Sequence, residues 1–282
     1  RYAWDLHHEY LADYRLDRRL GNAFPEVSYP VVAEDFAGSE RVAAGGYFTC
    51  TARCGGVYCQ GWSEGAVCGN DPVYREIGMG ERIGVRVVVP EGRRILEGHP
   101  DDIHAGLVHA CVLRGNVVSC FGADQNGALG NDADLLLCET QSTYRCRPGA
   151  LPIELPAPDL RFIALAHGIS STSCAITEGA GEVYCWGQNE VGQAGQDPVV
   201  EGTARWDSAV QGPVRTSTGP LTGVTEVAVG TSSTCARVGA AGPVYCWGAN
   251  DAGQLGELGT PHDVVTSPLA PPHPLAVQVT FP

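Results

Sequence analysis

The chain has 282 residues, of which 44% are apolar, and its 32 acidic and 18 basic side chains give a formal net charge of −14. This acidic balance argues against a nucleic-acid-binding protein, which needs a basic surface. All basic residues are arginine, so Schiff-base or Walker-type lysine chemistry is excluded, and no apolar run of about 18 residues predicts a transmembrane helix.

The N-terminal segment contains a strand pattern followed by a helical one. Tyr2–Trp4 has the pattern of a short strand, and residues 6–20 carry apolar side chains near helical spacing. We expect an amphipathic helix there, which either packs on the rest of the protein, the simpler interpretation, or binds a partner.

Four copies of one motif follow, and they align over 11 residues without a gap. They begin at Cys59, Cys120, Cys185 and Cys246, so the spacings are 61, 65 and 61 residues. A fixed period of this length predicts repeats of one supersecondary unit. We therefore expect a single domain over residues 1–282, with repeats near 39–82, 83–158, 159–220 and 221–272 and terminal half-repeats at 1–38 and 273–282.

The fourth repeat shows its strands most clearly. Val224–Val229 alternates, and two further strand patterns follow at Thr231–Val238 and Gly242–Trp247. Asn250–Gly256 then supplies the Asn and Gly residues of a turn. Three or four antiparallel strands per repeat is the organisation of a β-propeller blade, so the expected fold is an all-β propeller.

The chain has 12 cysteines, and eight of them recur at matching positions of the four repeats. Each repeat has a cysteine 9 or 11 residues before its Cys-x-Gly, with a tight turn between them, so both are expected on adjacent antiparallel strands. Directly opposed Cα atoms there lie about 4.5 Å apart, within reach of a disulfide. The predicted hairpin pairs are Cys50–Cys59, Cys111–Cys120, Cys174–Cys185 and Cys235–Cys246, and elimination leaves Cys54–Cys68 and Cys138–Cys146. Disulfides predict an oxidising compartment: secreted, periplasmic or cell-surface.

Metal sites are the alternative use of these cysteines. The sequence has no Cys-x-x-Cys, and no histidine stands at ligand spacing from a cysteine pair, so zinc is disfavoured. His104 and His109 are interpreted as buried, hydrogen-bonded or exposed side chains. Acidic turns at Asn70-Asp71, Asn131-Asp132 and Asn250-Asp251 could hold Ca²⁺, but Asx-turn chemistry explains them without a metal, so no cofactor is expected.

The two ends together have the pattern of a fifth, split repeat. Tyr2–Trp4 would be its last strand and Leu275–Phe281 its first. The cysteine-bearing middle strand is missing from both ends, so the array is open, belongs to a longer protein or is completed by a neighbouring chain. An unpaired edge can pair with another molecule, and the candidate assembly edges are Tyr2, Trp4, Val277, Val279 and Phe281.

The motif from Val244 to Gly256, Val-Tyr-Cys-Trp-Gly-x-Asn-x-x-Gly-Gln-Leu-Gly, closely resembles the repeat of the regulator-of-chromosome-condensation family. The resemblance covers about residues 39–260, and the secreted, cysteine-paired bacterial members are the most similar in style. The first copy departs from the motif with Gln60 for Trp, and the second with Phe121 for Trp and Asp124 for Asn. Family propellers usually have about seven blades, more than the complete repeats of this chain.

The resemblance implies three roles: an exchange factor for a nuclear GTPase, a secreted enzyme inhibitor, or a surface recognition module. Disulfides and acidic charge disfavour the first, and the simplest expectation is a non-enzymatic extracellular or cell-surface protein-interaction module. A subunit of a head-to-tail filament and a propeller enzyme are the rivals. Strand pairing between chains would favour the filament, and a pocket of clustered His, Glu and Asp would favour the enzyme.

Recognition is expected on the long loops between repeats. One loop holds Leu135, Leu136 and Leu137, and another holds Arg205 and Trp206, of which Arg and Trp are favoured binding anchors. The alternative is that these side chains cover the propeller face as a small core. The sequence has no Gly-x-Ser-x-Gly motif, and no catalytic residues can be assigned from it.

Overall fold

The structure is a computed structural model, and its strands pair antiparallel in several separate sheets. The residues that it describes are 2–3, 31–32, 39–46, 48–53, 56–62, 88–137, 145–197, 210, 212–256 and 273–279. The chain divides into two compact units, Arg1–Ser39 and Glu40–Pro282. The described part contains no helix that is long and apolar enough to cross a membrane.

The first compact unit contains one pair of short strands. β1 (Tyr2–Ala3) pairs with β2 (Val31–Val32) in antiparallel register, with Tyr2 opposite Val32. Trp4 and the helix predicted over residues 6–20 lie outside the described residues. The N-terminal strand therefore has a strand partner within its own unit.

Four larger sheets form the framework of the second compact unit. The first contains β3 (Arg41–Ala44), β4 (Phe48–Arg53), β5 (Gly56–Trp62) and β6 (Val88–Glu97). The second contains β7 (Asp102–Ala105), β8 (His109–Arg114), β9 (Val117–Ala123), β10 (Leu136–Leu137) and β11 (Arg145–Pro152). The third contains β12 (Phe162–His167), β13 (Thr172–Thr177) and β14 (Val183–Gly187). The fourth contains β17 (Val224–Val229), β18 (Ser233–Val238), β19 (Val244–Gly248) and β20 (Val277–Gln278).

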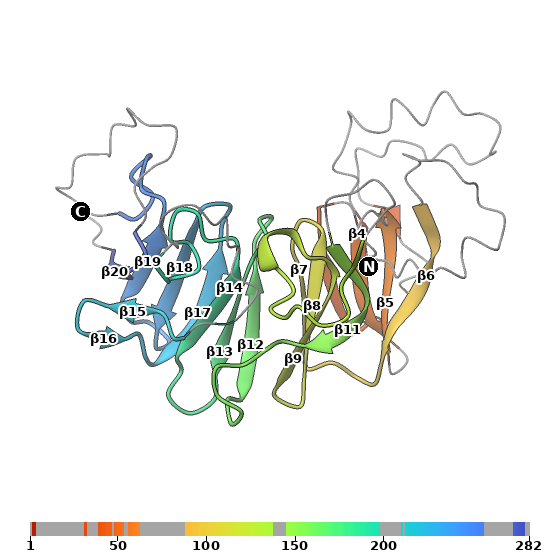
Figure 1. The fold of residues 1–282 in the computed structure, drawn as a ribbon, viewed down its shortest axis with the longest axis horizontal. Helices are drawn as coiled ribbons and strands as arrows, with labels where there is room; N and C mark the ends of the chain where they lie inside the picture. The colour runs from red at the N-terminus through yellow and green to blue at the C-terminus, as the bar shows by residue number, and fades with distance from the viewer. Residues whose placement is uncertain are drawn as a thin grey trace. The chain divides into compact units, whose positions relative to one another are not determined.

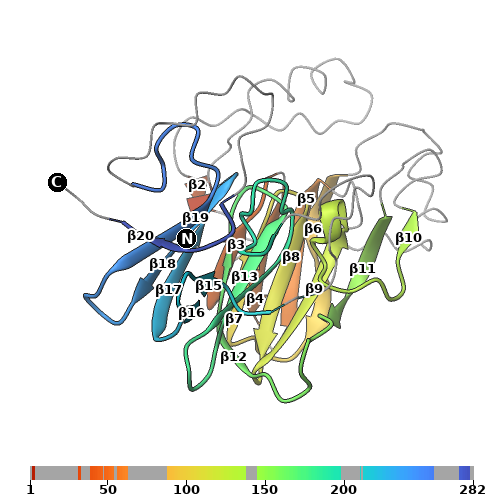
Figure 2. The ribbon, with the colours of Figure 1, turned by 60° about the vertical axis from the view of Figure 1, so that its left-hand side comes forward.

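The sheets follow one another in chain order, from the orange first sheet to the blue fourth sheet (Figure 1). In the second sheet, β11 pairs with β9, and β10 forms the outer edge beyond β11 (Figure 2). A small hairpin of β15 (Arg215–Thr216) and β16 (Gly219–Pro220) lies between the third and fourth sheets in the sequence. All four sheets are thus antiparallel and are built from segments that are local in sequence, as expected for propeller blades.

Two outer strands lie beyond the repeat boundaries that the sequence predicted. β6 pairs with β5, so it belongs to the first sheet although it follows residue 82. β20 pairs with β19, with Val277 opposite Cys246, and Val279 N–H donates to the Val244 carbonyl at 2.8 Å. The prediction that Leu275–Phe281 starts a closing repeat is therefore wrong. Its alternating pattern identified a strand, but not the partner of that strand.

The hairpin cysteines are bonded as the repeat spacing predicted. In each large sheet the two cysteines stand directly opposite each other in the register, with Cα atoms 4.1 Å apart. The disulfides are Cys50–Cys59, Cys111–Cys120, Cys174–Cys185 and Cys235–Cys246. Each of them therefore staples the middle strand of a sheet to the strand that follows it.

The two loop disulfides have a different outcome. Cys54, Cys68 and Cys138 lie outside the described residues. Cys146 is buried and free, which corrects the predicted Cys138–Cys146 disulfide. The physical reason is the register of β10 against β11, which places Leu136 opposite Cys146 in the described part of this hairpin.

The turn after the third strand is built alike in the second, third and fourth sheets. One side-chain oxygen accepts a hydrogen bond from the backbone N–H five residues later. The pairs are Asp124 with Leu129 (3.0 Å), Asn189 with Ala194 (2.9 Å) and Asn250 with Leu255 (3.1 Å). Gly248, Gly253 and Gly256 have φ of 108°, 76° and 65°, a region that favours glycine. This geometry explains the Gly and Asn positions of the motif.

Tryptophan links a repeat to the one before it. Trp186 Nε1 donates to the Ala128 carbonyl at 3.0 Å, and Trp247 Nε1 donates to the Gln193 carbonyl at 3.0 Å. Both rings are buried. Apolar clusters join the first sheet to the second, the second to the third, and the third to the fourth. The core of this unit therefore consists of interfaces between successive sheets.

Candidate functional site

The first strands of the four large sheets can be aligned by the glycine that follows each of them. These strands lie next to one another, β3 beside β7, β7 beside β12, and β12 beside β17. Each is followed by a glycine: Gly45, Gly106, Gly168 and Gly230. The residues directly before these glycines are Ala44, Ala105, His167 and Val229, and those one position earlier are Ala43, His104, Ala166 and Ala228. At these two positions before the glycine, the other repeats have alanine or valine. His104 and His167 are therefore the residues that differ from the repeat pattern.

A cavity of about 480 Å³ opens beside β3 and β7. Its polar lining includes Glu40, Arg41, Asp102, His104 and His167. Arg41 Nη1 lies 3.5 Å from Asp102 Oδ1, and His104 Nε2 lies 3.4 Å from Asp102 Oδ2. Asp102 therefore connects an arginine of the first sheet to a histidine of its own strand.

The ionised form of Asp102 is favoured in this setting. Burial opposes its ionisation, but the hydrogen bond and charge of His104, together with the backbone N–H groups of Leu165 and Ile103, outweigh burial and lower the pKa of Asp102. The Arg41 side chain is half-exposed, at 50%, whereas that of Asp102 is 23% exposed. The arginine is thus the more accessible partner of this pair.

The His167 ring of the cavity lining also contacts a further imidazole, that of His109. The rings of His109 and His167 have centroids 5.2 Å apart, and those of His104 and His167 are 5.9 Å apart. His109 is fully buried, and its Nε2 lies 2.9 Å from Ser173 Oγ. Burial lowers the pKa of His109 to about 4, and burial followed by the neighbouring His109 and His104 lowers the pKa of His167 well below its ordinary value. Both of these rings are consequently neutral at pH 7.

The inner histidine cluster, defined as His104, His109 and His167, was missed by the sequence interpretation. His109 is indeed buried and hydrogen-bonded, as one of the simpler readings expected. The cluster arises because His104 stands opposite Cys111 in the register, so that 104, 109 and 111 share a face, and because β12 packs beside that face. The comparison of repeats at the strand-ending glycine was the one sequence signal that could have revealed it.

The binding role expected of the long loops remains a prediction. Leu135 is partly buried against the core between the second and third sheets, as the small-core alternative predicted. Leu136 and Leu137 form β10, while Arg205, Trp206, Trp4 and Phe281 lie outside the described residues.

The acidic turns use their side-chain oxygens locally. Asn131 Oδ1 accepts hydrogen bonds from Ala133 N–H at 2.6 Å and from Arg147 Nη2 at 3.1 Å. Asn250 Oδ1 accepts from Leu255 N–H, and the Asn70-Asp71 turn lies outside the described residues. These two asparagine oxygens therefore accept hydrogen bonds from the protein itself, and the expectation that no cofactor binds here stays a prediction.

The cavity combines acid–base groups with a cation. The Asp102–His104 pair could move a proton, and Arg41 could bind a carboxylate or phosphate. None of the described lining residues is Ser, Thr or Cys, so a nucleophile is not among them. The arrangement is suited to ionic recognition and, with an added substrate group, to acid–base chemistry.

Comparison with known proteins finds sequence similarity to proteins with one kind of repeat. The model of the regulator of chromosome condensation (RCC1) repeat matches residues 168–193. A Bos taurus secretion-regulating guanine nucleotide exchange factor is 29% identical over 154 residues, 51% of this chain and 30% of that protein. The Drosophila melanogaster regulator of chromosome condensation is 29% identical over 199 residues, 68% of this chain and 31% of that protein. The chain thus spans about a third of the length of these curated relatives.

Solved structures agree on the fold. Saccharomyces cerevisiae Prp20p, described with its binding to Gsp1p and histones, has a TM-score of 0.63 at 18% identity, covering 91% of this chain and 54% of that one. Human WBSCR16 has a TM-score of 0.60 at 16% identity, covering 85% and 51%. At these identities the likeness concerns the fold, and this chain corresponds to about half of each of those proteins.

Proposed function

We propose that this chain, which is similar to RCC1-repeat proteins in sequence and in fold, is a non-enzymatic protein-interaction module whose recognition site is the cavity beside β3 and β7. The single observation that carries the proposal is the half-exposed Arg41 at the polar lining of that cavity. Proteins of this fold are described in complexes with other proteins, such as Kap60 bound to yeast RCC1. We propose that this chain likewise binds another protein.

Arg41 suits such a role because its present ion pair is weak. The 3.5 Å separation from Asp102 and the half-exposure of the Arg41 side chain bring this pair close to a surface ion pair, which contributes about 0–1 kcal/mol. A carboxylate of a partner could therefore displace Asp102 and bind the guanidinium with two hydrogen bonds. Arginine is also enriched among the residues that dominate interface energies. We expect the partner to insert an acidic side chain here.

The four hairpin disulfides support an oxidising location, so we propose that the module works outside the cytoplasm or on the cell surface. The acidic net charge supports a protein partner in preference to nucleic acid. Counting thiols in protein taken from its native compartment tests the location. Disulfides without free thiols at the hairpin positions are expected, and thiols at all eight would overturn it.

A specific observation favours each of two rival functions. The Asp102–His104 pair, with Glu40 nearby, is the clustered pocket that would favour an enzyme. The outer strand β20, with Val277 and Val279, could pair with the Tyr2 strand of a second chain in a head-to-tail filament. A secreted enzyme inhibitor would be a special case of the interaction module. The same variants separate these possibilities.

The test compares Arg41→Ala with the matched control Arg237→Ala, an arginine whose carboxylate partner belongs to its own hairpin. Partners cross-linked to the wild type are identified and then titrated by calorimetry. We expect Arg41→Ala to weaken binding about tenfold or more and Arg237→Ala to leave it unchanged. Equal affinity of both variants would overturn the proposed site. Turnover lost with His104→Ala would favour the enzyme, and sedimenting polymers would favour the filament.

A further inference from the structure

Three side chains of the types that bind metals meet beside the cavity, and one of them, His167, also lines it. Ring nitrogens of His109 and His167 and the sulfur of Cys111 all lie within 4.8 Å of one another. They come from two sheets, because His109 and Cys111 lie on β8 and His167 ends β12. A separation of this size is compatible with side chains that converge on one ion after small rotations.

The imidazole nitrogens that face this point lack partners. Among the described residues, His109 Nδ1 and both ring nitrogens of His167 are buried without a hydrogen bond. Buried polar atoms are nearly always satisfied, so a set of three such atoms points to a missing ligand. His109 Nε2 can donate to Ser173 Oγ at 2.9 Å, which leaves the Nδ1 lone pair free. A metal-binding histidine is typically oriented by such a second hydrogen bond.

The third side chain cannot bind a metal in the oxidised protein, because the Cys111 sulfur is bonded to Cys120 in the hairpin disulfide. We propose that this hairpin is a redox-gated zinc site, in which reduction releases the Cys111 thiolate to bind Zn²⁺ together with His109 and His167. Zn²⁺ prefers thiolate and imidazole ligands in tetrahedral geometry. The Cys120 sulfur, freed next to Cys111 at the same moment, is placed to supply the fourth ligand.

Opening the Cys111–Cys120 disulfide requires a reductant, and we propose a dithiol. The reductant gives two electrons and two protons to the Cys111–Cys120 bond and becomes a disulfide itself. The Cys111 thiol then loses its proton to solvent as its sulfur binds the metal. An entry path exists, because His167 also lines the cavity of about 480 Å³.

The other hairpin disulfides serve as internal controls. Phe48, Thr172 and Ser233 stand where the second sheet has His109, two residues before the first cysteine of the pair. Ala105 and Val229 stand where the third sheet has His167. The second hairpin therefore has both imidazoles beside its cysteines, and each of the others has neither. A purely structural disulfide would not need this difference.

Cys120→Ser provides the direct test, because it frees the Cys111 thiol while the other disulfides stay intact. Cys246→Ser is the matched control, since it frees Cys235 in a hairpin that has Ser233 in place of histidine. The probe is Co²⁺ alone, followed by displacement with Zn²⁺. We expect Cys120→Ser to bind about one Co²⁺ per chain with a near-ultraviolet thiolate-to-cobalt band. Cys246→Ser and the double variant Cys120→Ser/His167→Gln should lack the band.

A folded Cys120→Ser protein without the band, an equal band in Cys246→Ser, or a band that survives His167→Gln would overturn the proposal. Circular dichroism shows whether the metal-free variant is folded. If it is not, zinc-dependent recovery of the β-sheet signal in Cys120→Ser becomes the measurement. Recovery there and not in Cys246→Ser supports the site, and failure to recover contradicts it. Oxidised wild type should give no thiolate band, and wild type reduced with a phosphine should give one.

Discussion

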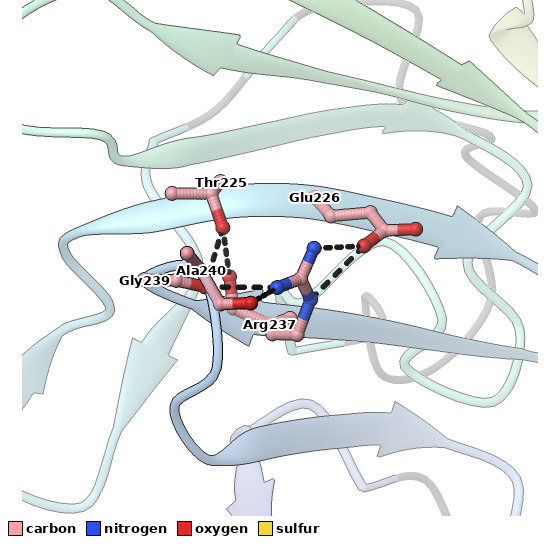
Figure 3. Close-up of polar contacts among 5 residues, drawn as sticks. All are labelled: Thr225, Glu226, Arg237, Gly239 and Ala240. Carbon is pink, nitrogen blue, oxygen red and sulfur yellow. Dashed lines mark hydrogen bonds and ion pairs between the residues drawn. The ribbon is translucent and has the colours of Figure 1, made fainter.

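The second and fourth sheets share one scaffold but place their charges differently. Both contain a hairpin disulfide and the same turn, in which Asp124 or Asn250 holds the backbone. In the second sheet Asp102 pairs with Arg41 of the neighbouring sheet beside a cavity. In the fourth sheet the corresponding Glu226 pairs with Arg237 of its own hairpin (Figure 3).

The fourth-sheet charges are satisfied within one hairpin. Arg237 donates from Nε and Nη2 to Glu226 Oε2, at 3.0 and 2.5 Å, and from Nη1 to the carbonyls of Gly239 and Ala240 (Figure 3). Thr225 Oγ1 donates to the same Gly239 carbonyl at 2.7 Å. The disulfides and turns that the repeats share thus support the fold. The charged residues that differ between repeats are the better candidates for function.

The largest effect is expected from the shared scaffold. Trp247→Ala empties a fully buried site and removes the hydrogen bond to the Gln193 carbonyl, so it should lower the free energy of unfolding by about 3–5 kcal/mol. Trp247→Phe is the control, because Phe121 fills this position in the second sheet. It should cost about 1–3 kcal/mol through the unpaired carbonyl. Denaturant unfolding measures both variants. Equal losses of stability in the two variants would contradict the separate contributions of the buried ring and of its hydrogen bond.

The second prediction concerns pH and the second sheet. Burial lowers the pKa of His109 from 6.5 to about 4, so the unfolded chain binds more protons between these values. The free energy of unfolding should therefore fall by about 3 kcal/mol as pH drops from 6.5 to 4, in EDTA to exclude metals. His167 acts in the same direction, and the His104 ring and the Asp102 carboxylate, 3.4 Å apart, lie on the cavity side of the cluster.

His109→Phe is the control for this pH effect, because it gives the second sheet the residue that Phe48 provides in the first. The variant should lose most of the pH dependence in this window and keep only the part due to His167. Denaturant midpoints measured at several pH values provide the comparison. An unchanged slope in the variant would assign the effect to other groups.

The scaffold was predictable from sequence and the site was not, for a physical reason. Strands, turns and hairpin disulfides depend on residues close in sequence, so the spacing of Cys174 and Cys185 was enough to pair them. The inner histidine cluster depends on which sheet packs beside which, a relation that periodicity does not contain. The place of Val277 was misassigned for the same reason, because a strand pattern does not specify which strand it pairs with. The Cys138–Cys146 pair rested on elimination alone, which does not show that two cysteines lie close together.

The turn side chains should give a smaller effect. Asn250→Ala removes the acceptor for Leu255 N–H in a buried turn and should cost about 1–2 kcal/mol. Asp124→Asn should be neutral or stabilising at pH 7, because burial, ahead of the Leu129 hydrogen bond, raises the pKa of Asp124. Its folded form favours the proton, so stability from this group is present at low pH and lost as pH rises. A destabilised Asp124→Asn at neutral pH would contradict this reasoning.

The smallest effect is expected from the self-contained charge pair of the fourth sheet. Glu226 and Arg237 have side chains 61% and 34% exposed, and such pairs contribute about 0.2–1 kcal/mol. Glu226→Ala leaves Arg237 its contacts to the Gly239 and Ala240 carbonyls, so the loss should stay below about 1 kcal/mol and shrink in high salt. Arg41→Ala should cost equally little in unfolding experiments and yet weaken partner binding. If Glu226→Ala weakened binding as much, the functional contrast between the two sheets would be wrong, since charge as such, and not charge beside the cavity, would then determine recognition.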